Sequence, residues 1–308
     1  MLTWERGNRK LWLCVFGLLL CVGSVGQVAT ADDLTLEVAS RARALQPGEA
    51  ILLTVTPSHP LASLEGAGFD HAAAVWQDSA ARWYALTGIP LETTPGAATI
   101  TLKATSLDGE STTSTQPLTI ATAAFETRRL KVAERFVNPP KSMIPRITRE
   151  SETLAAVFGN SQPERIWRGG FRRPVPGQST SSFGRLSVLN GVSRGRHQGA
   201  DFRAATGTPV VAPNAGRIVL VADHYFSGQT VIIDHGGGLL SLFAHFSRVA
   251  VTSGIVVKAG DRLGDAGATG RVTGPHVHWA VRLQGLTVDP LSLIAALDGL
   301  DETPNTVR

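Results

Sequence analysis

The second half of the chain is a succession of short segments with β-strand character, and this feature restricts the fold more than any other. Turn residues separate the segments, which cover residues 208–212, 216–222, 229–234, 239–244, 254–258, 262–265 and 276–283. There is almost no helical periodicity between them. Short strands bounded by Gly, Pro and Asp are typical of antiparallel sheets. The sequence therefore predicts an antiparallel β-sheet folded into a groove.

Residues 32–123 also have the pattern of short strands. Leu34, Leu36 and Val38 alternate with polar residues, and residues 99–105 alternate again with apolar side chains on one face. Asp108 and Gly109 then form a hairpin-type turn. Several short strands at this spacing predict a small β-sandwich of immunoglobulin-like kind, so that the whole chain is mainly β.

The N-terminal residues 1–31 have the pattern of a secretory signal peptide. Basic residues precede the apolar run 11–22, and small residues end the segment at Ala31. We expect cleavage before Asp32 and export to the periplasm or cell envelope; an uncleaved anchor is the alternative. Lipidation at Cys21 is disfavoured by the bulky Leu20 before it. Since Cys14 and Cys21 both lie in this segment, the mature chain has no cysteine to serve as ligand or nucleophile.

Residues 124–170 differ from both flanking regions and read as a basic connector. Arginines and lysines are spread among prolines, and residues 149–158 have a helical pattern that ends at Gly159. We interpret the charges as a solvated linker face, with a glycan or lipid headgroup contact as the alternative. A second domain of residues 171–296 and a tail of residues 297–308 follow. Removal of residues 1–31 lowers the net charge from +4 to about +2, which is too small to indicate nucleic-acid binding.

The residues that could bind a metal or transfer protons form one pattern in the second domain. His276 and His278 are two apart on a predicted strand, so both side chains emerge on one face. His197 and Asp201 form a His-x-x-x-Asp pair upstream, and His245 lies near the end of an apolar strand. A catalytic zinc usually takes three protein ligands and leaves one position open. His197, Asp201 and one strand histidine supply that set, and the remaining strand histidine and His245 are candidates for proton transfer.

Other polar residues of this domain have less specific roles. Asp234, Asp265 and Asp289 are candidates for orienting imidazole N–H groups, although turn or capping roles are the stronger interpretation. We interpret His224 and His235 as surface or turn residues.

The ordered motifs of residues 171–293 resemble the catalytic domain of lysostaphin-type (LytM-like) zinc metallopeptidases. They are His197 to Asp201, Gly207 to Val210, Ala215-Gly216, Asp234 to Gly236, Phe243 to His245, and Thr269-Gly270 through Gly274 to Trp279. The resemblance implies that His197, Asp201 and His278 bind Zn²⁺ and that His245 and His276 are catalytic. Residues 83–89 and 95–96 are similar to the β-rich N-terminal domain of some Gram-negative members.

The family resemblance implies hydrolysis of peptide bonds in peptidoglycan stems or cross-bridges by a zinc metalloendopeptidase. Three positions depart from the family pattern: Phe243 replaces a common Tyr, Phe246 a Leu, and Ala280 an acidic residue. Some relatives have lost zinc ligands and act as non-catalytic activators of amidases, so a regulator with a cell-envelope protein partner is the alternative function. The sequence does not specify the bond cut or the oligomeric state.

The first domain and connector either cover or position the groove, or serve as a passive spacer. If they cover it, a chain starting near Phe171 should cleave a soluble stem peptide faster than the full mature chain.

Overall fold

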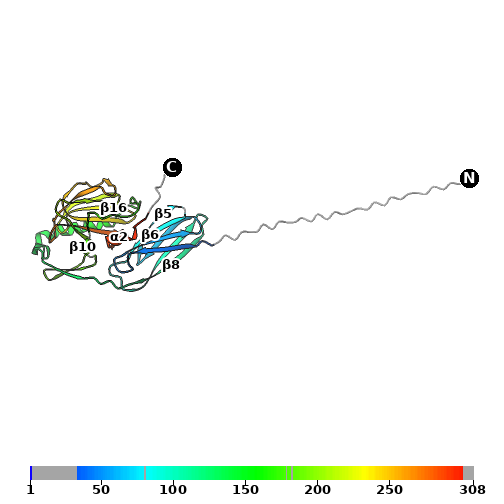
Figure 1. The fold of residues 1–308 in the computed structure, drawn as a ribbon, viewed down its shortest axis with the longest axis horizontal. Helices are drawn as coiled ribbons and strands as arrows, with labels where there is room; N and C mark the ends of the chain where they lie inside the picture. The colour runs from blue at the N-terminus through cyan, green and yellow to red at the C-terminus, as the bar shows by residue number, and fades with distance from the viewer. Residues whose placement is uncertain (2–32, 80, 178, 182, 301–308) are drawn as a thin grey trace. The chain divides into compact units, whose positions relative to one another are not determined.

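β-Strands are the main regular structure of the computed structural model, which describes Met1 and residues 33–79, 81–177, 179–181 and 183–300 (Figure 1). Most of the predicted signal peptide, and residues 301–308 of the predicted tail, lie outside the described residues. Among the helices in these ranges, none is long and apolar enough to span a membrane.

The first domain consists of two four-stranded antiparallel sheets, coloured blue to cyan in Figure 1. One sheet has the order β1-β2-β6-β5 and the other β4-β3-β7-β8. The strands are β1 (Leu36–Ala42), β2 (Ala50–Pro57), β3 (Leu61–Gly68), β4 (His71–Ala72), β5 (Ala74–Ser79), β6 (Arg82–Gly88), β7 (Gly96–Ser106) and β8 (Ser111–Ile120). Buried side chains from both sheets, such as Ile51 and Leu102, form one apolar cluster. The mainly β class is confirmed, while the immunoglobulin-like assignment stays a prediction.

A ten-stranded antiparallel sheet forms the body of the second domain, as predicted. Its main path is β10-β13-β20-β17-β16-β15-β18, with β14 and β19 paired to each other, β19 also paired to β17, and β21 paired to β20. The strands are β10 (Ser179–Ser181), β13 (Ala200–Arg203), β14 (Pro209–Val211), β15 (Gly216–His224), β16 (Gly228–Gly236), β17 (Leu239–Val249), β18 (Val256–Val257), β19 (Arg262–Ala266), β20 (His276–Leu283) and β21 (Leu286–Val288). Helix α2 (Pro290–Ala296) follows, capped by the Asp289 carboxylate.

The connector contributes regular structure to the second domain. Its strand β9 (Thr127–Leu130) pairs in parallel with β11 (Leu186–Leu189), which pairs with β12 (Val192–Arg196). Beyond β9, Val132 N–H donates to Asn190 Oδ1 at 3.0 Å. Two short 3-10 helices follow, η1 (Glu134–Phe136) and η2 (Lys141–Met143). The connector is thus held against the second domain at its start.

Helix α1 (Ile144–Phe158) begins five residues before the predicted helical segment. Pro145 lies in its first turn, where a missing N–H costs nothing because that N–H has no helical acceptor. Leu154, Val157 and Phe158 pack on an apolar cluster of β16 and β17, to which Ala280 of β20 also belongs. Since side chains alternate along β20, Ala280 is on the same face as His276 and His278. Helix α1 therefore lies on the sheet face that carries the strand histidines.

The sandwich and the second domain share a hydrophobic core. The cluster joins residues of β2, β5 and β6, among them Leu52 and Trp76, to Trp167, Phe171 and the centre of the large sheet. The Trp76 and Trp167 rings meet edge to face, with centroids 5.0 Å apart.

Candidate metal centre

Two neighbouring strands and the end of a third bring the predicted ligands together. Asp201 of β13 is directly opposite His278 of β20 in the antiparallel register. His197 follows β12, and its backbone N–H donates to Arg185 O at 2.8 Å. A sheet pairing and a short loop therefore position all three side chains.

The three side chains present one nitrogen or oxygen atom each to a common point. His197 Nε2 is 3.1 Å from Asp201 Oδ1 and 3.1 Å from His278 Nδ1, and His278 Nδ1 is 2.9 Å from Asp201 Oδ1. Two imidazole nitrogens and one carboxylate oxygen match the ligands that zinc takes in catalytic sites. The residues present therefore fit a zinc ion.

The surroundings of Asp201 favour its ionised form. Burial would raise the pKa of this carboxyl group, but hydrogen bonds with His197 and His278, and the charges of both rings, hold the pKa well below its usual range. Burial lowers the pKa of His278, against the opposing effect of Asp201. A carboxylate and a neutral imidazole are the protonation states that bind a metal.

His276 and His245 lie side by side next to this centre. Their ring centroids are 4.7 Å apart, and the centroid of His245 is 6.2 Å from that of His278. His276 Nε2 is 3.9 Å from Asp201 Oδ1. The structure thus brings all five predicted site residues together.

A β-bulge in β17 determines where His245 points. Phe246 pairs with Gln229 and Phe243 with Val231, so Ala244 and His245 are opposite the single residue Thr230. His245 has φ of 69°, a left-handed conformation that is uncommon for a non-glycine residue. A bulge re-aims a side chain relative to strict alternation. It moves His245 away from the core face occupied by Phe243 and Phe246 and beside His276.

Main-chain carbonyls fix the tautomers of both histidines. His245 Nδ1 is 2.8 Å from Thr269 O, and His276 Nδ1 is 2.8 Å from Gly274 O. A carbonyl only accepts, so each Nδ1 carries the proton, and each neutral ring has a free lone pair on Nε2. Burial, together with the charges of His276 and His278, lowers the pKa of His245 to about 3. The His245 ring is therefore neutral at pH 7.

Gly199 permits the close approach of His278 to the loop between His197 and Asp201. A Cβ atom at Gly199 would lie 2.4 Å from Trp279 O and 2.7 Å from His278 Cε1. Both distances are shorter than non-bonded contacts allow. The glycine in this His-x-x-x-Asp segment therefore leaves room for the ligand ring.

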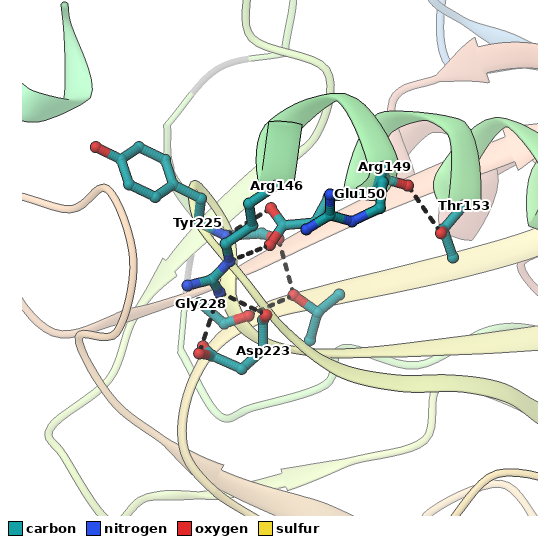
Figure 2. A network of polar contacts seen from close by, with 9 residues as sticks. Arg146, Arg149, Glu150, Thr153, Asp223, Tyr225 and Gly228 are labelled. Atoms are coloured by element: carbon teal, nitrogen blue, oxygen red, sulfur yellow. Dashed lines mark hydrogen bonds and ion pairs between the residues drawn. The ribbon is translucent and has the colours of Figure 1, made fainter. Parts of the chain in front are cut away.

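The turn between β15 and β16 supports the backbone of His245 and is itself held by α1. His245 N–H donates to Ser227 O at 2.9 Å. Figure 2 shows the network at this turn, where Arg146 bonds to both Glu150 and Asp223. Glu150 Oε2 accepts the Tyr225 backbone N–H at 2.8 Å. The connector helix thus fixes the segment that holds a candidate catalytic residue.

The interpretation of His224 and His235 as surface or turn residues is wrong, because both are buried. His235 Nδ1–H donates to Ala215 O at 2.7 Å, and His235 Nε2 is 2.9 Å from Ser241 Oγ. Trp279 Nε1–H donates to the same Ser241 oxygen at 3.1 Å. The sequence suggests loops at both positions, but β15 extends to His224 and β16 extends through His235. Both rings are therefore packed within the sheet and covered.

The three aspartates that were candidates for orienting imidazole N–H groups have structural roles instead. Asp289 caps α2, Asp265 pairs with Arg248 and Arg262, and Asp234 accepts the backbone N–H groups of Gln162 and Gly236. The acceptors that orient His245 and His276 are main-chain carbonyls instead. The sequence did not point to Thr269 or Ser227, because every residue has a main-chain carbonyl and residue type does not show which one accepts.

The departures from the family pattern lie away from the ligand atoms. Phe243 and Phe246 are buried in the core, and Phe243 stacks on Trp279 with 6.0 Å between ring centroids. Ala280 belongs to the apolar cluster under α1, where an acidic side chain would be desolvated.

A sequence profile described as Peptidase family M23 matches residues 195–290, which contain all five site residues. The peptidoglycan DD-endopeptidase ShyA of Vibrio cholerae is 38% identical over 95 residues, which are 31% of this chain and 22% of ShyA. A metalloprotease of Haemophilus influenzae is 35% identical over 141 residues, which are 44% of this chain and 30% of the relative. The chain thus spans less than a third of the length of these curated relatives.

A crystal structure from Pseudomonas aeruginosa, assigned to peptidase M23, matches over a much larger part of the chain. It is 31% identical with a TM-score of 0.62, and the match covers 82% of this chain and 96% of that one. The similarity therefore includes the first domain and the connector as well as the motif-bearing sheet. The chain belongs to peptidase family M23.

Proposed function

We propose that the chain is an exported zinc-dependent metalloendopeptidase that hydrolyses peptide bonds of peptidoglycan stems or cross-links. The observation that carries the proposal is the convergence of His197, Asp201 and His278 beside the paired rings of His245 and His276. Relatives named as peptidoglycan DD-endopeptidases support the choice of substrate. Export is supported by the signal-peptide pattern of residues 1–31.

Three of the five residues would bind the metal and two would transfer protons. His197, Asp201 and His278 would hold zinc, which when bound polarises a carbonyl and makes water a better nucleophile at neutral pH. One imidazole Nε2 of the His245–His276 pair takes a proton from the attacking water. The other, when protonated, donates to the developing oxyanion or to the leaving amine nitrogen. Thr269 O and Gly274 O keep both rings in the orientation that this transfer needs.

A non-catalytic regulator would not require this arrangement. Docking of an amidase or a glycan needs a surface, whereas two imidazoles with fixed tautomers beside a three-ligand set serve proton transfer. For this reason we favour the peptidase over the regulator.

The test is digestion of purified peptidoglycan by the mature chain, with and without a zinc chelator, followed by identification of the released stem peptides. We expect release of peptides that stops with chelator and returns when zinc is added. Zinc binding without any bond cleavage would instead support the regulator.

A further inference from the structure

Arg271 lies in the loop between β19 and β20 and is held there by Phe226. Its backbone N–H donates to Phe226 O at 2.8 Å, and its guanidinium carbon is 4.7 Å from the centroid of the Phe226 ring. The side chain is partly buried. A guanidinium that stacks on a ring by its face keeps its N–H donors in its own plane, where they can bind a carboxylate.

Arg271 and its partner Phe226 come from the two segments that contact His245. Thr269, two residues before Arg271, accepts the His245 Nδ1–H bond at 2.8 Å. Ser227, the residue after Phe226, accepts the His245 backbone N–H at 2.9 Å. The segments that carry Arg271 and Phe226 therefore both contact the candidate catalytic His245.

Arg271 has no acidic partner among the described residues, unlike several other arginines of the second domain and connector. Arg248 and Arg262 pair with Asp265, and Arg146 pairs with Glu150. In the part of the chain that the structure describes, no carboxylate is within ion-pair distance of Arg271. Burial, and then the positive charge of Arg194, lower the pKa of Arg271, although a guanidinium remains charged at neutral pH.

Arg194 of strand β12 is a second cation close enough to lower the pKa of Arg271. It donates to Val137 O in the connector. Tyr225 Oη–H donates to Arg135 O at 2.6 Å, and the Tyr225 and Phe226 rings are 5.1 Å apart between centroids. Contacts thus run continuously from Arg194 through the connector to Tyr225, Phe226 and Arg271. The Glu134 carboxylate offsets part of the charge of Arg194, since Arg194 helps to lower the pKa of Glu134, whereas no such carboxylate faces Arg271 among the described residues.

We propose that Arg271 binds a free carboxylate of the peptide substrate close to the scissile bond, and that Arg194 strengthens this attraction. The chain would then select acidic peptides over their amidated counterparts. This inference rests on the proposed peptidase function and adds the substrate class to it. Arg271 is here a specificity-determining residue, since it contacts the substrate and takes no part in proton transfer.

The experiment uses two soluble cross-linked peptides of the same sequence, one with free carboxylates and one with those groups converted to carboxamides. Values of kcat/KM are measured for the full mature chain and for Arg271→Gln, Arg271→Lys and Arg217→Gln. A charge-assisted hydrogen bond corresponds to roughly 10- to 100-fold in rate or affinity. Arg217 is the control because it is exposed and donates only to Gly254 O at 2.9 Å among the described residues.

We expect the unsubstituted chain to prefer the acidic peptide by roughly 10- to 100-fold. Arg271→Gln should lose this preference by slowing only the acidic peptide, Arg271→Lys should retain part of it, and Arg217→Gln all of it. Equal slowing of both peptides by Arg271→Gln would overturn the proposal and leave Arg271 as a loop anchor. Equal rates on the two peptides by the unsubstituted chain would overturn it as well.

A binding measurement separates this inference from the proposed function. If either peptide is cleaved, the peptidase proposal holds whatever the preference. If neither is cleaved, calorimetric titration of both peptides into the full chain and into Arg271→Gln still tests the carboxylate preference. Conversion of one carboxylate at a time identifies which one is bound.

Discussion

At the scale of single residues, the ligand set can be tested by metal content. We predict that the mature chain binds about one zinc and that His278→Ala loses it, since two remaining ligands hold zinc poorly. The measurement is zinc per protein after dialysis against a weak chelator. His276→Ala is the matched control, because it removes an imidazole two residues away on the same face. Full zinc content in His278→Ala would contradict the assignment.

The two candidate catalytic histidines should separate binding from chemistry. We predict that His245→Ala and His276→Ala keep zinc but lose about 10²- to 10⁴-fold in kcat, the usual contribution of a general acid or base. Zinc content and peptide release are measured on the same preparations. Near-normal turnover in either variant would assign that histidine a structural role.

Gly199 should matter for its small size. Gly199→Ala places a methyl group against Trp279 O and the His278 ring, so the ring must move. We predict a loss in zinc affinity of about 10- to 100-fold, the size typical when the support of a ligand is disturbed. Gly274→Ala is the control, because a Cβ there meets no atom within 4 Å. Equal zinc affinities in the two variants would show that the ring adapts.

At the scale of secondary-structure elements, the sequence predicted β20 and the main strands of the large sheet well. Alternation with Val277 and Trp279 was sufficient to place His276 and His278 on one face. The position of His245 was not predictable in the same way, because the bulge at Ala244 and His245 is a property of the pairing with β16. Carbonyl acceptors and the burial of His235 also depend on pairing between segments far apart in sequence.

The buried His235, among the paired strands β15, β16 and β17, makes the stability of the folded chain depend on pH. Burial lowers the pKa of His235 to about 4 in the folded chain, against about 6.5 when unfolded. Between these values the unfolded state binds more protons, so stability falls as the pH is lowered from about 6.5 towards 4. The difference corresponds to about 3 kcal/mol in total, of which about 2 kcal/mol is lost between pH 7.5 and pH 5.

The test compares urea unfolding of the unsubstituted chain and His235→Asn at pH 7.5 and pH 5. Asparagine does not titrate, so the variant should lose about 2 kcal/mol less over this interval, even if its stability is lower at both pH values. Other histidines contribute equally to both proteins and cancel in the comparison. The same pH dependence in both would show that His235 does not carry this linkage.

At the scale of the whole molecule, residues 34–300 behave as one packed body because the sandwich and the large sheet share a core. Leu52, Trp76 and Leu86 belong to the same buried cluster as Trp167 and Val288. A chain starting near Phe171 would therefore lose part of its own core as well as any cover over the site. Lower activity of that fragment would not exclude a cover, so contacts are better broken one at a time in the full chain.

The polar part of the shared interface centres on Arg43. Its guanidinium pairs with the buried Glu49 and, at 2.6 Å, with Asp289 Oδ2 ahead of α2. Arg43→Ala would leave both carboxylates without this cation. Because Arg43 is itself 38% exposed, we predict a loss of about 2 kcal/mol, less than for a fully buried pair.

This prediction is checked by urea unfolding followed with both Trp fluorescence and circular dichroism. The shared core predicts a single transition by both probes in the unsubstituted chain and in Arg43→Ala. Arg82→Ala is the control, because Arg82 pairs with Asp78 within the sandwich at 3.7 Å and is 51% exposed, so its loss should cost under about 1 kcal/mol. Two separate transitions would mean that the sandwich and the peptidase sheet unfold independently. Equal losses in the two variants would mean that the Arg43 contacts add nothing to the junction.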